Sequence, residues 1–166
     1  MKGVNMMRAT ILAFVTMATV GPMVSPVEAQ AEGGEAVAIV VHPEVPIDDL
    51  SFDALKSIFL AERQHWGDRS RITLLVRAAM APERDRVLSE IYDMTEDRYR
   101  RYWIGKMFRS EVASGPKIVF STDMLRDLVT VIPGSIGFVP VSEVGPDLKV
   151  ISIDGLFPGD DGYPLN

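Results

Sequence analysis

The sequence predicts an α/β fold with a mostly parallel sheet and helices on both of its faces. Short apolar runs rich in β-branched residues, typical of buried strands, alternate along the chain with segments whose apolar residues recur at helical spacing. The connections between these segments are short, and right-handed crossovers between parallel strands place helices on both faces of a sheet. No internal repeat or linker divides residues 36–166, which we expect to form one domain.

The first part of this domain is expected to contain two strands and one helix. Residues 36–41, AVAIVV, form a continuous apolar run, which is typical of a strand buried on both faces in a parallel sheet. Ser51 is the predicted N-cap of a helix that ends near residue 60. A polar loop around Trp66 separates this helix from a second buried strand at residues 71–76.

Two more helices are predicted after this strand. Pro82 fits the first turn of one helix, and Thr95 is the predicted cap of the next, which runs to about residue 108. The apolar and aromatic residues of that longer helix recur every four positions, which predicts a core-facing stripe. The stripe consists of Tyr99, Trp103 and Met107.

The remaining elements are three strands and a helix between the first two. A short strand is expected at residues 117–120, and Ser121 or Thr122 is the predicted cap of the helix that follows it. Strands at residues 136–139 and 148–153 complete the pattern.

The first 31 residues have the layout of a secretory signal peptide. Basic residues precede the apolar run at residues 9–20, which Gly21 and Pro22 end, and small residues follow. A membrane-spanning helix needs about 20 apolar residues, so the shorter run favours a cleaved leader over an uncleaved anchor. We therefore predict that residues 1–31 are removed and that the protein is periplasmic.

Composition excludes several classes of protein and site. The 166 residues include no cysteine, so a disulfide scaffold, a thiol nucleophile and a cysteine-ligated metal are excluded. A net charge of −6 argues against a nucleic-acid partner, because binding phosphates takes clustered Lys and Arg. The sequence has no zinc hydrolase motif, serine hydrolase elbow, P-loop or dinucleotide fingerprint. We expect neither catalysis nor a metal or cofactor.

Arg77 is the main candidate for binding chemistry. It follows the strand at residues 71–76, so its guanidinium is expected at the carboxyl edge of the sheet, where α/β folds bind ligands. Its fork of donors suits phosphate or carboxylate, and a structural ion pair is the alternative. His42 also ends a predicted strand, and a hydrogen-bonded structural role is favoured over ligand binding there.

Other charged residues are interpreted as solvated surface. The charged residues 83–86 and the trio Arg98, Arg100 and Arg101 are expected to face water, and the alternative is an arginine that reaches an anion at a helix N-terminus. The adjacent acids at residues 48–49 and 160–161 are interpreted as solvated turns, with calcium binding as the alternative.

Several segments together resemble the phosphate-binding proteins of bacterial ABC uptake systems. Their order and spacing agree with that family over nearly all of residues 36–166. The segments are residues 39–77, 100–108, 133–144, 148–158 and 162–166. In that family two α/β lobes close over one oxyanion, which is held without catalysis. The resemblance implies one lobe of a type II periplasmic binding protein.

The resemblance also implies a function and a site. Arg77 matches the ligand arginine of the family, and Ser121 and Thr122 at a predicted helix N-terminus would supply a hydroxyl and free N–H groups. The implied protein binds phosphate or another small oxyanion, with a membrane transporter or another periplasmic protein as its partner. Relatives carry a Gly- and Ser-rich turn after the arginine, whereas residues 78–82 here read AAMAP, which offers no hydroxyl and predicts weak binding. A ligand-free interaction or sensory module that kept the fold is the alternative.

Overall fold

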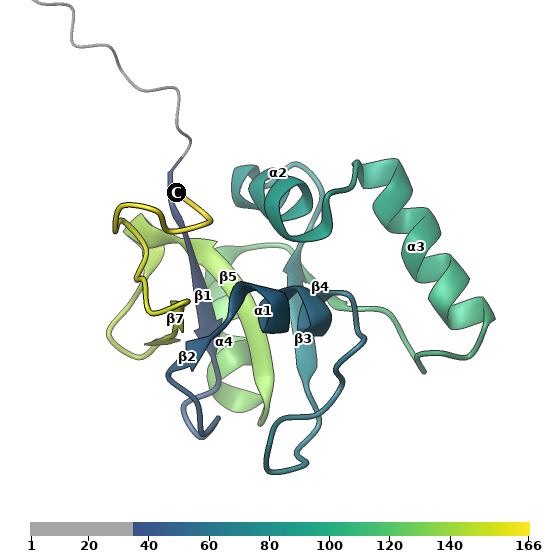
Figure 1. Ribbon diagram of the computed structural model, residues 1–166, viewed down its shortest axis with the longest axis horizontal. Coiled ribbons are helices and arrows are strands. Elements are labelled where there is room, and N and C mark those ends of the chain that lie inside the picture. The colour runs from purple at the N-terminus through teal and green to yellow at the C-terminus, as the bar shows by residue number, and fades with distance from the viewer. Residues whose placement is uncertain (1–34) are drawn as a thin grey trace, which may run out of the picture. The chain divides into compact units, whose positions relative to one another are not determined.

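The structure of the protein is a computed structural model that describes residues 35–166 (Figure 1). The predicted leader at residues 1–31 lies outside the described residues. Within residues 35–166, no helix is both long enough and apolar enough to cross a membrane. The described chain contains a five-stranded sheet, a small two-stranded sheet and the helices that connect their strands.

The five-stranded sheet has the strand order β4-β3-β5-β1-β6. Its strands are β1 (Val37–Val41), β3 (Thr73–Arg77), β4 (Lys117–Val119), β5 (Ser135–Pro140) and β6 (Lys149–Val150). β3 is parallel to β4 and to β5, which confirms the mostly parallel α/β prediction. β1, however, is antiparallel to both β5 and β6. The expectation that this strand has parallel neighbours is wrong, because a continuous apolar run reports burial on both faces and not strand direction.

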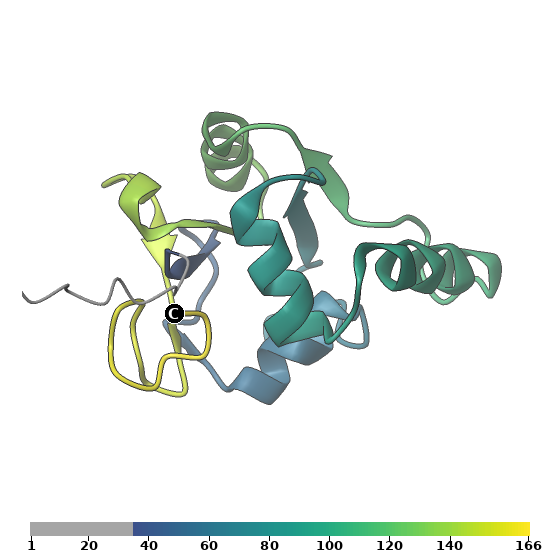
Figure 2. The same ribbon diagram turned by 90° about the horizontal axis from the view of Figure 1, so that it is seen from above.

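Helices cover both faces of this sheet, as Figure 2 shows. One face carries α1 (Phe52–Phe59) and α2 (Pro82–Val87), which continues into the single π-helical turn η1 (Leu88–Tyr92). The opposite face carries α4 (Thr122–Val131). The longest helix, α3 (Glu96–Phe108), packs against η1 at the side of the fold. A 3-10 turn, η2 (Val141–Glu143), follows β5.

The side chains of β1 alternate between two cores. Val37, Ile39 and Val41 belong to the larger core under α1 and η1, and Ala38 and Val40 belong to the smaller core under α4. This alternation explains why every residue of the strand is apolar, since a polar residue would be buried on either side.

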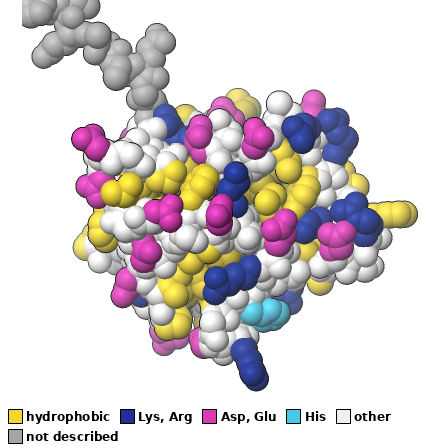
Figure 3. Space-filling view, viewed as in Figure 1, with side chains coloured by type: hydrophobic (Ala, Val, Ile, Leu, Met, Phe, Trp, Pro, Cys, Tyr) yellow, Lys and Arg dark blue, Asp and Glu magenta, His cyan; other side chains and the backbone are white. Residues whose placement is uncertain are grey.

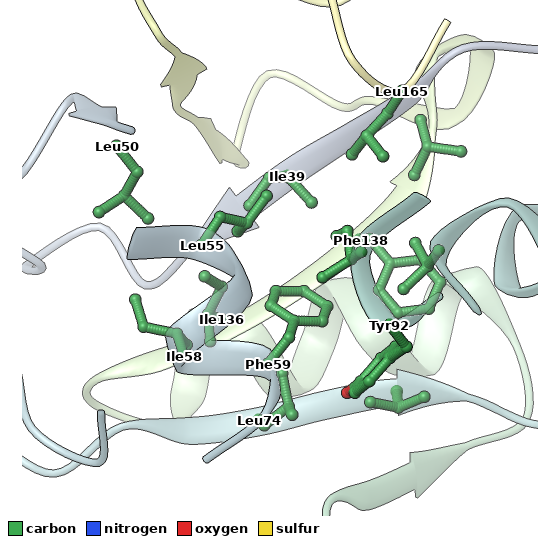
Figure 4. Close-up of a cluster of buried hydrophobic side chains, with 14 of the residues drawn as sticks. Ile39, Leu50, Leu55, Ile58, Phe59, Leu74, Tyr92, Ile136, Phe138 and Leu165 are labelled. Carbon is green, nitrogen blue, oxygen red and sulfur yellow. The ribbon is translucent and has the colours of Figure 1, made fainter. Parts of the chain in front are cut away.

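The larger core combines aliphatic side chains with aromatic rings (Figure 4). The ring of Phe59 meets that of Tyr92 edge to face, with centroids 5.9 Å apart, and lies 6.3 Å from the ring of Phe138. These contacts hold α1, η1 and β5 together. Tyr99 and Trp103 of the predicted stripe on α3 are buried, as expected. The prediction is wrong for Met107, which is 42% exposed.

The helix N-caps follow the sequence prediction. Ser51 Oγ accepts the N–H of Ala54 at 3.2 Å, and Thr95 Oγ1 accepts the N–H of Arg98 at 3.4 Å. Each bond satisfies a first-turn N–H that has no partner inside the helix. The third predicted cap, before α4, belongs to the candidate site and is described below.

The last predicted strand, residues 148–153, is two strands in two sheets. β6 continues the large sheet, and β7 (Ser152–Ile153) pairs in parallel with β2 (Asp49–Leu50). The chain changes partner between them, because Ile151 donates to the carbonyl of Ile39 at 3.1 Å and Ser152 donates to that of Asp48 at 3.0 Å. β2 was not predicted, since a two-residue strand has no periodicity to detect.

Asp49 links β2 to the chain that follows β7, and its removal is expected to change the acid sensitivity of the fold. Its Oδ1 accepts the hydroxyl of Ser152 at 2.6 Å and the N–H of Gly155 at 2.9 Å, and these bonds lower the pKa of the carboxyl. A lowered folded-state pKa stabilises the protein above the unfolded pKa, and this contribution is lost as the pH falls through the folded-state pKa. Urea unfolding of Asp49→Asn should therefore show a larger loss relative to wild type at neutral pH than at pH values below the lowered folded-state pKa. Equal losses at both pH values would contradict this role.

Candidate anion-binding site

Strands β3 and β4 end next to each other at one edge of the sheet. Arg77 is the last residue of β3 and pairs in parallel register with Val119 of β4. The N–H of Ala78 donates to the carbonyl of Val119 at 2.8 Å, which extends the pairing past the strand. Ser121 and Thr122 follow β4 almost directly. The structure therefore places the three residues proposed from the sequence at one carboxyl edge, as parallel pairing of their strands requires.

Ser121 and Thr122 form the start of α4. Ser121 Oγ accepts the N–H of Met124 at 3.1 Å, so this residue is the N-cap, and Thr122 begins the helix with its side chain buried. The hydroxyl of Ser121 acts here as an acceptor and keeps its own O–H as a donor. The remaining first-turn N–H groups and the helix dipole make this end of α4 favourable for negative charge.

Arg77 already holds one anionic group, the carboxylate of Glu83. Arg77 Nε donates to Glu83 Oε1 at 2.5 Å, and the two side chains are only 12% and 5% exposed. Glu83 lies in the first turn of α2, immediately after Pro82. Of the two alternatives for Arg77, the structural ion pair is therefore present. A bound oxyanion would have to share the guanidinium with Glu83 or replace it.

The guanidinium of Arg77 retains an unused donor. Its Nη1 is buried and has no hydrogen-bond acceptor within residues 35–166. A buried charged donor without an acceptor is costly, so an acceptor brought by a ligand would form a strong charge-assisted bond at this atom. Among the buried side-chain N and O atoms of Arg77, Ser121 and Thr122, Nη1 is the one without a hydrogen-bond partner in residues 35–166.

Arg84 fixes the position of the chain at Arg77. Its Nε and Nη2 donate to the two carboxylate oxygens of Glu96 at 3.0 and 3.1 Å, and its Nη1 donates to the carbonyl of Arg77. The guanidinium also lies over the ring of Tyr99, 4.8 Å from its centroid. The fork thus ties the end of β3 to the first turn of α3 and to the aromatic core.

The interpretation of residues 83–86 as solvated surface is wrong for two of the four residues. Glu83 is 6% exposed and Arg84 is 3% exposed. The helical spacing does indicate that Arg84 is buried. Arg84 lies three residues before Val87 and four before Leu88, so it shares the inward face of these residues. These residues were expected to face water because charged side chains are rarely buried without partners.

Two buried tyrosines lie beside Arg84 and remain uncharged. Burial raises the pKa of Tyr99 to about 12, although the nearby Arg84 cation opposes the shift. Burial also raises the pKa of Tyr92 well above its usual value, and the neighbouring Tyr99 adds to this effect. The rings meet edge to face with centroids 4.9 Å apart. Since both phenols stay neutral at neutral pH, Glu96 is the group that balances the charge of Arg84.

An acidic hollow lies next to this site, at the end of β5. Its volume is about 540 Å³, and α2, η1 and the residues around Pro140 line it. The acids on its walls are Glu35, Glu83, Asp85, Glu90 and Glu143, and the basic residue among them is Arg86. This excess of carboxylates disfavours an anion in the hollow.

His42 has a structural role, and no group of side chains among the described residues supports a metal site. His42 is buried, and its Nδ1 accepts the N–H of Glu44 at 3.2 Å, which agrees with the structural role favoured from the sequence. Among residues 35–166, no three His, Asp or Glu side chains are grouped so that they could hold a metal ion.

The fold of the described residues is similar to part of several solved structures. A scan against protein-family models and a search of curated proteins found no match. Solved structures do match. An ABC-type phosphate transport receptor from Vibrio cholerae superposes with a TM-score of 0.64 at 22% identity, over 79% of this chain and 53% of that one.

Two further structures show the same similarity. PstS from Borrelia burgdorferi has a TM-score of 0.61 at 15% identity, over 79% of this chain and 54% of its own. A protein from Clostridium perfringens, described as a phosphate ABC transporter substrate-binding protein with bound phosphate, has a TM-score of 0.60 at 17% identity. The match covers 74% of this chain and 46% of that one. The chain thus spans about half the length of these relatives. The expected resemblance is confirmed as a likeness of fold.

Proposed function

We propose that the protein is an exported solute-binding protein that holds phosphate or a similar small oxyanion without catalysis. The observation that carries the proposal is the buried, unpartnered Nη1 of Arg77 at the same sheet edge as the N-terminus of α4. The fold shared with the phosphate-binding structures supports this choice of ligand class. The proposal extends to a periplasmic location and to a membrane transporter or another periplasmic protein as partner.

In the proposed complex each group has a separate role. Arg77 Nη1 donates to one oxygen of the anion, and the hydroxyl of Ser121 and the N–H groups of Thr122 and Asp123 donate to others. The turn at residues 78–82 contributes only backbone N–H groups, because it has no hydroxyl and Pro82 has no N–H. Glu83 competes for the guanidinium, so we expect weak binding.

Calorimetric titration with phosphate, sulfate and acetate tests the proposal. The wild-type protein should bind phosphate saturably at millimolar concentration. The double variant Arg77→Gln, Glu83→Gln removes the cation without leaving the buried carboxylate unpaired, and it should lose this binding. Absence of saturable binding to the wild type, or unchanged binding to the double variant, would overturn the assignment.

The interaction-module alternative has one observation in its favour. Apolar side chains near the same sheet edge are exposed, including Met80 at 95% and Phe120 at 76%. Exposed apolar groups of this size are found at protein interfaces. If the titration shows no anion binding, capture of a partner from periplasmic extract by wild type but not by Phe120→Ser would favour the module. Equal capture by both would contradict it.

A further inference from the structure

A second hollow lies at the opposite end of β3 and β4 from Arg77. Its volume is about 340 Å³, and it lies between the end of α1, the beginnings of β3 and β4, and the segment that follows α3. β3 has five residues, so the two ends of the strand are about 13 Å apart. None of the residues proposed for the oxyanion site lines this hollow.

The charged residues that line this hollow are all basic. They are Arg63, Arg71 and Lys117, and no Asp or Glu lines it. Arg63 Nε donates to the carbonyl of His65 at 3.2 Å, and none of the three cations forms an ion pair with a carboxylate within residues 35–166. In a chain whose net charge is −6, three cations without acidic partners around one hollow make a local positive field.

Buried apolar side chains form part of the wall of the hollow. Ile58, Leu74 and Trp103 line it, and each is less than one-tenth exposed. Gln64 is held at the rim, because its Nε2 donates to the carbonyls of Ala61 at 3.3 Å and Glu111 at 3.1 Å. In the space-filling view of Figure 3, Lys and Arg side chains lie next to hydrophobic surface in the lower part of the face, where the loop before β3 lies in Figure 1. A preformed apolar wall with basic groups at its mouth is typical of a small-molecule site.

We propose that this hollow binds an organic anion, namely a small apolar or aromatic body that carries a carboxylate or a phosphate monoester. The apolar body lies against Trp103 and Leu74, and the acidic group meets Arg71 and Lys117 at the mouth. An inorganic ion would leave the apolar side chains of the wall in contact with water, and a neutral ligand would form no ion pair with the cations. The proposal does not rest on the oxyanion site at Arg77.

Titration with phenyl phosphate and benzoate, with inorganic phosphate as the comparison, tests this site by calorimetry. The aromatic anions should bind saturably, and Arg71→Glu combined with Lys117→Glu should weaken them by about tenfold or more. The control is Arg101→Glu, a charge reversal at an exposed residue of α3 that does not line the hollow. It should leave the affinity unchanged.

Other outcomes would overturn the proposal. The first is that neither aromatic anion binds saturably. The second is that the Arg101 control weakens their binding as much as the double variant does. The third is that inorganic phosphate displaces a bound aromatic anion as effectively as another aromatic anion does. The double variant Arg77→Gln, Glu83→Gln separates the two sites. It should abolish binding at the oxyanion site and leave binding of phenyl phosphate in this hollow intact, and loss of both would place the aromatic anion at Arg77 and contradict the second site.

Discussion

Replacing Glu83 with Gln is expected to tighten phosphate binding by about tenfold to a hundredfold. The carboxylate of Glu83 takes the Nε donor of Arg77 at 2.5 Å and neutralises a largely buried guanidinium. A hydrogen bond to a charged group contributes about 1.5–3 kcal/mol, and each 1.4 kcal/mol changes an affinity tenfold. The neutral amide keeps an acceptor oxygen for Arg77 and removes the competing charge, so the guanidinium can attract an oxyanion. Calorimetric titration of both proteins measures the change in Kd.

Asp85→Asn is the matched control for this experiment. Asp85 lies on the same helix, is exposed, and contributes the same charge to the neighbouring acidic hollow, but it forms no ion pair with Arg77. The control should change the affinity by no more than about twofold, as expected for a screened surface charge. If both variants gained affinity equally, the general field of the acidic hollow and not the ion pair would explain the effect. No gain in Glu83→Gln would show that Glu83 does not compete for the anion.

Arg84→Met should lower the free energy of unfolding by about 3 kcal/mol. Arg84 is 3% exposed, and its fork joins Glu96, the carbonyl at the end of β3 and the ring of Tyr99. Breaking a buried charge pair costs about 3–5 kcal/mol, and the lower end applies because the side chain of Glu96 is 32% exposed. Urea unfolding followed by circular dichroism measures the loss.

Arg100→Met is the control, because Arg100 pairs with the same carboxylate from the surface. Its Nε lies 3.6 Å from Glu96 Oε1, and its side chain is 64% exposed. A pair of this kind on a helix surface contributes about 0.3–0.5 kcal/mol. Similar losses in the two variants would mean that Arg84 acts only as a surface partner of Glu96, and the account of how the end of β3 is held would be wrong.

Features that depend on a few neighbouring residues were predictable from the sequence. Ser51, Thr95 and Ser121 were expected as N-caps because capping joins residues three apart, and all three bonds are present. Arg77 was also expected at the carboxyl edge of the sheet, because it follows a buried strand. It is the last residue of β3 and pairs with Val119 of β4.

Features that depend on distant parts of the chain were not predictable. Strand pairing decides the direction of β1 and divides residues 148–153 between two sheets. The local sequence pattern does not indicate which strands pair. Burial of Glu83 and Arg84 depends on partners from β3 and α3. The sequence therefore indicated a candidate anion site and left a structural ion pair of Arg77 open as the alternative, but it did not identify Glu83 as the partner.

The most direct test of the oxyanion site is a crystal structure of Glu83→Gln grown with arsenate, whose anomalous scattering distinguishes it from water and phosphate. We expect one anomalous peak within hydrogen-bonding distance of Arg77 Nη1 and of the first turn of α4. Crystals of Arg77→Gln, Glu83→Gln grown in the same way should lack this peak. No peak near Arg77 in the single variant, or one that persists in the double variant, would contradict the proposed site.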